Sequence, residues 1–514
     1  MGAIMIAGAL VFWVFDALPF QDLPEHAGLI ALRHRFAHSA FDQRFFVLAP
    51  HLGPYSLFRF LGDLLVVPLG PVGAVRAIAT LPLIATPLAL VWARRRLHGD
   101  PSATGAYFGL ALGFGFMALL GFASYLLGLA VLIVALTAWL ELLRAVDTRS
   151  PSAAKRELGI ACTTPLVLLV HGHAFVVLTA LQGISALAAG DRWRRLVRTR
   201  AVVPALLLAA WVEWRERKSM VPAGSAPVPH ADLHAHFQGP FDKLSLLVTP
   251  TLMTRSGADG LVGLVLWGVV IAAAVATARS LKQTIDERQE SQETASRAHA
   301  QALLVSAIAL AVVFLILPHS IGWFGFVDGR LVPLLLLLPI MAVRRPALGP
   351  RVGIAFDRVA PLAAGAMASI ALVGSYLFQS EATGWQQVLA QVPSNARLLY
   401  LPVEPNSDVL TAHPFVHYDK LVMAERPIIV GDLWFHQGSG VYPTAANPAL
   451  YLPPTYSASD LHRVDWPAYR LGDWDWLLCR TRALSAEPWV PAPFALSARR
   501  GGWWLFRKRG EAGP

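Results

Sequence analysis

Long apolar runs recur along the first three quarters of the chain and restrict its possible folds more than any other feature. A run of about 17 to 25 residues is long enough to cross a hydrocarbon layer of about 30 Å as a helix. Of the 514 residues, 55% are hydrophobic and only 15% are charged, whereas soluble domains are about 25% charged. We therefore predict a polytopic α-helical membrane protein with about 11 transmembrane helices. The predicted spans are roughly 1–18, 77–93, 103–121, 124–143, 157–172, 173–190, 201–214, 258–278, 300–317, 331–344 and 357–378.

Arginine-rich loops between these runs set the predicted orientation, because basic loops stay in the cytoplasm. These loops lie at 94–96, 144–156, 191–200 and 344–351. The N-terminus is then inside, and the outer loops are 19–76, 215–257 and 318–330. The same loops account for the formal net charge of +10, so we expect no nucleic-acid partner.

Two apolar segments need a separate interpretation. The run 1–18 has no positively charged leader and no obvious small-residue cleavage site, so we expect a retained first span. The segment 54–72 is apolar enough to span, but a span there would place the arginines at 94–96 outside. We therefore expect 54–72 to lie on the membrane surface or to be re-entrant. The expected location is the inner (cytoplasmic) membrane of a bacterium.

The last part of the chain, 379–514, differs in composition and is predicted to be a small α/β or α+β domain outside the membrane. Short helix-like and strand-like stretches alternate there with Pro, Asn, Ser and Asp turns. Residues 384–391 favour a helix, and 397–403, 474–480 and 503–508 favour strands. The predicted organisation is a transmembrane domain at 1–378 and an extracytoplasmic domain at 379–514. The two cysteines, Cys162 and Cys479, share no metal spacing, and we expect no disulfide between them.

The motif Asp22-Leu-Pro-Glu25-His26 follows directly after the first apolar run. In a helix that starts here, Asp22, Glu25 and His26 share one face, and Arg33 lies two turns beyond His26. Ionisable side chains at a membrane mouth are costly and commonly functional. The alternative is purely structural: Asp22 as N-cap, Pro24 in the first turn and Glu25 at the third position resemble a capping box.

Three further sets of polar residues are candidates. His230, Asp232, His234 and His236 alternate in an outer loop, and imidazole and carboxylate are ligands for zinc, although the alternative is a polar loop on the membrane surface. His171 and His173 flank a glycine between two runs, where they can line a cavity or belong to a tight helical hairpin. Arg330 precedes the tenth run, where a guanidinium can bind phosphate in a bidentate manner or reach toward lipid headgroups.

The layout of these features resembles the GT-C glycosyltransferases, in the broad neighbourhood of the protein-mannosyltransferase and aminoarabinose-transferase type. The first span ends in an outer loop with acidic residues, followed by Pro54-Tyr55 and an apolar surface stretch. A Gly-rich approach then leads to Arg76, and a span ends in Arg-Arg-Arg-Leu-His-Gly at 94–99. Arg330 heads a late span, and a small external domain follows.

The resemblance implies a polyprenyl-phosphate-linked sugar as donor and transfer on the outer side of the membrane. It implies that an acidic residue of the first outer loop is the general base or helps to hold a divalent metal. Asp22 is the best-placed match, with Glu25 and His26 in support. Arg330, together with Arg33 and His319, is expected to bind the donor phosphate. The family pattern often has adjacent acids, whereas Leu-Pro separates Asp22 from Glu25 here.

The expected partners are a polyprenyl-phosphate sugar, membrane lipids, and a lipid, glycan or protein acceptor. Two other function classes stay open at this point. A transporter or flippase for a lipid-linked or envelope component also places ionisable residues at membrane depth, but the sequence has no evident inverted repeat. A non-catalytic member of the same fold would keep the layout without the chemistry.

Overall fold

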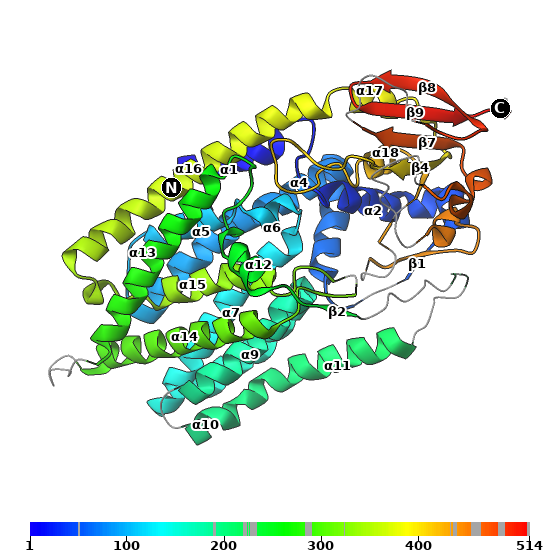
Figure 1. The fold of residues 1–514 in the computed structure, drawn as a ribbon. Coiled ribbons are helices and arrows are strands. Elements are labelled where there is room, and N and C mark those ends of the chain that lie inside the picture. The colour runs from blue at the N-terminus through cyan, green and yellow to red at the C-terminus, as the bar shows by residue number, and fades with distance from the viewer. Residues whose placement is uncertain are drawn as a thin grey trace.

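The computed structural model describes most of the chain. The described residues are 1–49, 52–188, 192–218, 224, 226, 234–282, 290–322, 324–431, 433–434, 439–453, 464–481 and 489–510. Helices fill the region up to residue 382, and a small sheet lies at one end of the helical region (Figure 1).

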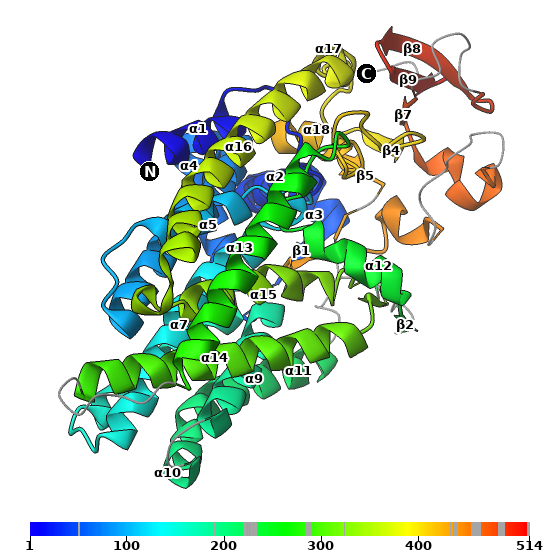
Figure 2. The same ribbon diagram turned by 60° about the vertical axis from the view of Figure 1, so that its left-hand side comes forward.

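Within the described residues, five helices are long and apolar enough to cross a membrane. They are α4 (Ser56–His98), α7 (Ala123–Asp147), α13 (Ala258–Ser280), α14 (Glu290–Ile316) and α16 (Pro350–Ala382). Shorter helices pack around them, and Figure 2 shows how α13, α14 and α16 cover one side. The shorter helices are α1 (Gly2–Trp13), α5 (Thr104–Leu112), α6 (Phe116–Leu119), α8 (Ala153–Val170), α9 (Gly172–Ala188), α10 (Arg192–Val197), α11 (Val203–Lys218), α12 (Pro240–Ser245) and α15 (Val332–Ala342).

The predicted count of about eleven spans is not confirmed by these helix lengths. The run 103–121 is divided into α5 and α6. In the break between them, the backbone at Gly115 lies against Pro250, and an added Cβ there would be 2.1 Å from the Pro250 carbonyl oxygen. The run 1–18 forms a helix of only 12 residues. Predicted spans 157–172 and 173–190 form the tight hairpin α8–α9, which turns at His171.

The segment predicted to lie on the surface or to be re-entrant, 54–72, contains the start of α4. Helix α4 is 43 residues long and is interrupted at Gly70, whose φ of 69° and ψ of 172° are not helical. Pro68 and Pro71 flank the interruption, and a proline removes a backbone donor from the helix. The first part of α4 therefore leads into a kink before the apolar part that ends at His98.

The tail forms a five-stranded sheet in the order β5-β4-β7-β9-β8 within the described residues. Its strands are β4 (Arg397–Leu401), β5 (Ile429–Val430), β7 (Trp476–Arg480), β8 (Phe494–Arg500) and β9 (Trp503–Lys508). β4 runs parallel to β5 and β7, whereas β9 is antiparallel to β7 and β8. The sequence prediction of a helix at 384–391, realised as α17 (Trp385–Leu389), and of three strands is confirmed. Helix α16 runs through the predicted boundary at 378 to Ala382.

The first outer loop of the sequence prediction lies between the helical region and the sheet, and it packs against the tail. Its helix α2 (Leu23–Arg35) packs against α18 (Asp419–Glu425) of the tail, beside α4 (Figure 1). Strand β1 (Phe46–Leu48), which follows α3 (Ala40–Phe45), pairs antiparallel with β6 (Val441–Pro443). Gly28 permits the close approach of α2, since a Cβ there would be 3.2 Å from the Lys420 Cβ. Segments almost 400 residues apart thus form one unit.

Candidate functional site

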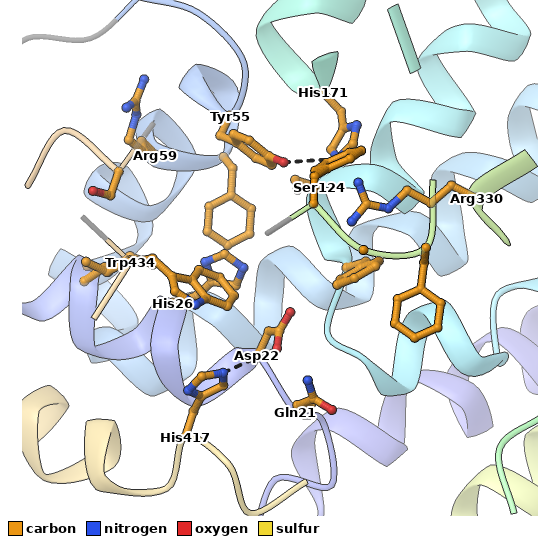
Figure 3. Close-up of a pocket in the computed structure, with 18 of the residues that line it drawn as sticks. Gln21, Asp22, His26, Tyr55, Arg59, Ser124, His171, Arg330, His417 and Trp434 are labelled. Atoms are coloured by element: carbon orange, nitrogen blue, oxygen red, sulfur yellow. Dashed lines mark hydrogen bonds and ion pairs between the residues drawn. The ribbon is translucent and has the colours of Figure 1, made fainter. Parts of the chain in front are cut away.

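A cavity of about 320 Å³ lies where α2, the helical region and the tail meet. The labelled residues in Figure 3 line it and come from all three parts of the chain. Its lining includes Gln21, Asp22, His26, Arg33, Tyr55, Phe58, Arg59, Phe122, Ser124, His171, Phe324, Arg330, His417, Trp434 and Ser439. The sequence-predicted residues Asp22, His26, Arg33 and Arg330 are therefore brought together around one cavity.

Asp22 precedes the first residue of α2, but its carboxyl group does not cap the helix. The backbone N–H of Asp22 donates to the carbonyl of Leu120 at 3.1 Å, and that of Gln21 donates to Leu119 at 2.9 Å. Gly121, with a φ of +84°, lets this turn approach closely, since a Cβ there would be 2.9 Å from the Asp22 nitrogen. The capping-box alternative is therefore wrong for Asp22, and its side chain instead lines the cavity.

Burial governs the electrostatics of Asp22, which lies outside the candidate membrane spans and is 5% exposed. Burial raises the pKa of its carboxyl group to about 8, while a hydrogen bond from Gln21 and the charge of Arg330 act in the opposite direction. A carboxyl group with this pKa is largely protonated at neutral pH. A group that titrates near the working pH is suited to general acid–base chemistry.

Arg330 faces the cavity from the opposite side (Figure 3) and is 6% exposed. It belongs to the short helix η5 (Gly329–Leu331). Its guanidinium carbon lies 4.6 Å from the ring centre of Phe122 and 3.9 Å from that of Phe324. Within the described part of the chain, its Nε and Nη1 atoms have no hydrogen-bond partner. The group is therefore buried rather than extended toward lipid headgroups, and its open donors suit an anion.

Asp328 anchors the turn that carries Arg330. Its carboxylate accepts from Gly329 N–H at 2.7 Å and from Lys243 Nζ at 3.0 Å, and lies 2.9 Å from His319 Nδ1. Lys243 also donates to the Phe314 carbonyl at 2.9 Å. His319, predicted to bind donor phosphate, is thus engaged behind the turn and is not among the residues lining the cavity; its phosphate role stays a prediction.

The hairpin α8–α9 and the start of α4 close another side of the cavity. Tyr55 has a φ of +68°, which is uncommon for a bulky residue and is found at functional sites. Its hydroxyl lies 3.4 Å from His171 Nε2. His171 lines the cavity, whereas His173 Nε2 lies 3.2 Å from the Val327 carbonyl oxygen. The two sequence alternatives for this pair, a cavity lining and a tight hairpin, therefore both hold for His171.

The tail supplies Trp434 and His417. The Trp434 ring centre lies 5.3 Å from that of His26 and 5.5 Å from that of His417, and His26 also packs on Phe58 at 4.4 Å. Burial lowers the pKa of His26 to about 4, so the ring is neutral at physiological pH. An aromatic surface of this kind can pack against the apolar face of a sugar ring.

Glu25 is fully buried beneath the cavity, with charged groups of α18 around it. Its Oε1 accepts from the Trp434 backbone N–H at 2.9 Å, and its Oε2 lies 3.6 Å from His417 Nδ1 and 3.7 Å from Lys420 Nζ. Lys420 also lies 3.1 Å from Asp419 Oδ1. Sequence reasoning missed this set of tail residues. The pair Asp419-Lys420 at the start of a short apolar helix could have indicated this set. Charged side chains next to buried apolar residues need partners of opposite charge.

The remaining predicted residues are less centrally placed. Arg33 lines the cavity but forms a two-point ion pair with Asp63, at 3.1 Å and 2.6 Å. His230 and Asp232 lie outside the described residues. His234 precedes β2 (Ala235–His236), which pairs with β3 (Ser320–Ile321). Across the ranges that the structure describes, no three His, Cys, Asp or Glu side chains form a group that could hold a metal ion. Metal binding therefore stays a prediction.

The architecture described above is a GT-C-like fold, which confirms the resemblance drawn from the sequence. ArnT from Cupriavidus metallidurans bound to undecaprenyl phosphate matches with a TM-score of 0.57 and 14% identity, over 100% of this chain and 99% of that chain. The apo form of that ArnT matches with a TM-score of 0.56. The arabinofuranosyltransferase AftD from Mycobacteria matches with a TM-score of 0.52 and 16% identity, over 100% of this chain and 40% of that chain.

The sequence itself matches no protein-family model, and a search of curated proteins found no match either. At these identities the structural likeness establishes the fold. The fold and the five long apolar helices together support an integral membrane protein.

Proposed function

We propose that this chain is a membrane glycosyltransferase that moves a sugar from a polyprenyl-phosphate donor to an acceptor on the outer side of the membrane. The observation that carries the proposal is the pair of buried groups facing one cavity: a carboxyl group with a raised pKa at Asp22, and the Arg330 guanidinium. The GT-C-like fold supports this proposal, and the structural neighbour ArnT was solved with undecaprenyl phosphate bound.

In the proposed reaction the acceptor oxygen attacks the anomeric carbon of the donor sugar. The new bond forms between the acceptor oxygen and that carbon. The bond from the carbon to the phosphate oxygen breaks, and its electron pair stays with the phosphate. The acceptor proton passes to a carboxylate oxygen of Asp22.

Arg330 is proposed to stabilise the leaving phosphate. The phosphate gains negative charge as the sugar departs, and a buried guanidinium stabilises that charge more strongly than it would in water. The aromatic rings of Phe122 and Phe324 hold the group in place. His26 and Trp434 are proposed to form the wall against which the sugar packs.

The first experiment measures binding of undecaprenyl phosphate to the protein in lipid nanodiscs, and conversion of polyprenyl-phosphate sugars to free polyprenyl phosphate in the presence of cell-envelope extract. Arg330→Ala is expected to weaken binding about 10- to 100-fold, because a charge-assisted hydrogen bond is lost. Arg330→Lys is expected to be intermediate, since it keeps the charge but not the planar fork.

Arg351→Ala is the matched control, because Arg351 is exposed at the start of α16. It should bind and convert as wild type does. Equal binding by wild type and Arg330→Ala would overturn the phosphate assignment. Binding without any conversion, across donors with different sugars, would favour a transporter or a non-catalytic member of the fold.

A further inference from the structure

Three apolar side chains in α12 and just before it face outward instead of packing inside the protein. Phe237, Phe241 and Leu244 are 60%, 86% and 54% exposed, and we call these three residues the α12 patch. Phe241 and Leu244 are three residues apart and therefore neighbours on the short helix, while Asp242 is exposed as well. Exposed apolar surface next to polar side chains marks a contact with a membrane or with another protein.

The α12 patch lies at the end of α14, which is a candidate membrane span. The exposed side chains of the last turns of α14 are Val312, Leu315 and Ile316. Lys243 attaches α12 to this helix end (Figure 2), because its Nζ donates to the Phe314 carbonyl at 2.9 Å. A lysine there also satisfies a backbone acceptor that the helix terminus leaves open. The patch therefore continues the exposed apolar surface of α14.

The candidate span α13 holds the other end of the α12 segment. The short helix η3 (Leu246–Val248) follows α12 directly, and Trp267 of α13 donates to the Leu247 carbonyl at 2.7 Å. Leu261 and Leu264, near the start of α13, are exposed. The α12 patch thus adjoins the exposed apolar surfaces of two candidate spans, a position that suits the boundary between acyl chains and headgroups. This continuity favours the lipid leaflet over a second protein as the occupant.

The same segment is attached to the wall of the cavity. Lys243 is 4% exposed and pairs with Asp328 at 3.0 Å, and Asp328 in turn accepts the Gly329 N–H at 2.7 Å in the turn that carries Arg330. Strand β2, just before the patch, pairs with β3, and Phe324, which follows β3, lines the cavity. These contacts form a continuous connection from the α12 patch to Arg330.

We propose that the α12 patch inserts into the lipid leaflet on the cavity side of the membrane and sets the height of Arg330 relative to that leaflet. Insertion removes two aromatic rings and a leucine side chain from water, whereas Asp242 stays at the polar surface. Insertion itself is independent of the reaction. The effect on Arg330 rests on the proposed function, because the phosphate of a lipid-linked donor lies at the level of the headgroups.

Insertion is tested with a fluorophore on single cysteines, in nanodiscs whose lipid acyl chains carry a spin-label quencher. Cys162 is first replaced by serine because it is exposed, whereas Cys479 is buried. A label at Phe241→Cys should be quenched as strongly as a label at Leu315→Cys on α14. A label at Leu496→Cys, which is exposed on β8 of the tail, should stay unquenched. Quenching of the Phe241→Cys label no stronger than that of the Leu496→Cys label would overturn the proposal.

The link to Arg330 is measured as binding of undecaprenyl phosphate in nanodiscs. The triple variant Phe237→Ser, Phe241→Ser, Leu244→Ser should bind about fivefold more weakly, at the lower end of couplings between sites. Its Tm in detergent should match the wild type, because the replaced side chains are exposed. Leu496→Ser is the matched control and should bind as the wild type does.

Wild-type binding by the triple variant, or weaker binding accompanied by a lower Tm, would refute the link between the α12 patch and Arg330. Failure of the wild type to bind undecaprenyl phosphate would instead refute the proposed function together with the link. The quenching measurement needs no donor, so it decides whether the patch inserts in either case.

Discussion

The two sides of the cavity hold their charges in opposite ways. Arg330 carries a fixed positive charge between aromatic rings, on a turn that Asp328 and Lys243 anchor from behind. Asp22 lies beside titratable groups, with His417 next to it and Glu25 beyond. In the proposed reaction, the Arg330 side holds a fixed charge and the Asp22 side accepts a proton. Burial alone therefore does not determine the role of a charged residue, since Asp22 and Arg330 are almost equally buried.

Substitution of Asp22 is expected to give the largest difference between the two sides of the cavity. Asp22→Asn is expected to lower transfer about 10²- to 10⁴-fold, because the amide cannot accept the acceptor proton, while binding of undecaprenyl phosphate stays near the wild-type level. Rate and binding are measured on the same nanodisc preparation. Asp465→Asn, an exposed change in the tail, serves as control. If Asp22→Asn weakens binding as much as Arg330→Ala does, the two sides do not have separate tasks.

Lys420→Met tests how much the ion pairs of Lys420 stabilise the Asp22 side of the cavity. Lys420 is fully buried and contacts Glu25 and Asp419. Removing one partner from a buried ion cluster costs about 3–5 kcal/mol, so we expect a clearly lower Tm and a weakened contact between α2 and α18. Thermal unfolding in detergent measures this against exposed Lys282→Met. An unchanged Tm would show that the cluster contributes little to the docking of the tail.

Gly121→Ala moves Asp22 without changing its chemistry. The new Cβ would be 2.9 Å from the Asp22 nitrogen and 3.0 Å from its Cβ, at a φ of +84°. A displacement of about 1 Å costs up to about 10²-fold in rate, so we expect a loss of about 10- to 100-fold with donor binding retained. Gly268→Ala on α13 is the control, since its Cβ meets nothing within 4 Å. Wild-type transfer by Gly121→Ala would mean that the position of Asp22 is not critical.

The smallest expected effect is a change in the pKa of Asp22 when Arg330, on the other side of the cavity, is replaced. The charge of Arg330 lowers the pKa of Asp22, so Arg330→Ala should raise the infrared titration midpoint of Asp22 by about one pH unit. In the wild type, kcat/KM should rise with pH up to about 8, because the carboxylate is the active form and its fraction falls below that pKa. An unchanged midpoint in Arg330→Ala would show that the two groups do not interact.

Part of this site was predictable from sequence because membrane topology restricts where charges can lie. Asp22, His26 and Arg330 were predicted to face one cavity on the same side of the membrane, and all three line it. Their signal was local, since each stands at the end of an apolar run. The roles of these residues are the subject of the experiments above.

The tail residues were not predictable by the same reasoning. His417, Lys420 and Trp434 reach the site through the packing of α18 on α2 and the pairing of β6 with β1, and no local pattern encodes a contact over almost 400 residues. Tyr55 was noted only as part of a motif, because its left-handed backbone conformation is visible only in the structure. The predicted span count is not confirmed for a related reason, since the run 103–121, which composition alone joins, is divided into α5 and α6, with the backbone at Gly115 packed against Pro250.

The docking of α18 on α2 also has a consequence for biosynthesis. At about 5–20 residues per second, a ribosome needs roughly 20 to 80 seconds after completing α2 to reach α18. During that interval the acidic end of α2 has no tail to cover it, so the cavity of the newly made chain lacks the side chains that the tail supplies, His417 and Trp434. Completion of the cavity therefore requires that the tail reach the same side of the membrane as α2, and a chain that stalls before α18 has an incomplete cavity.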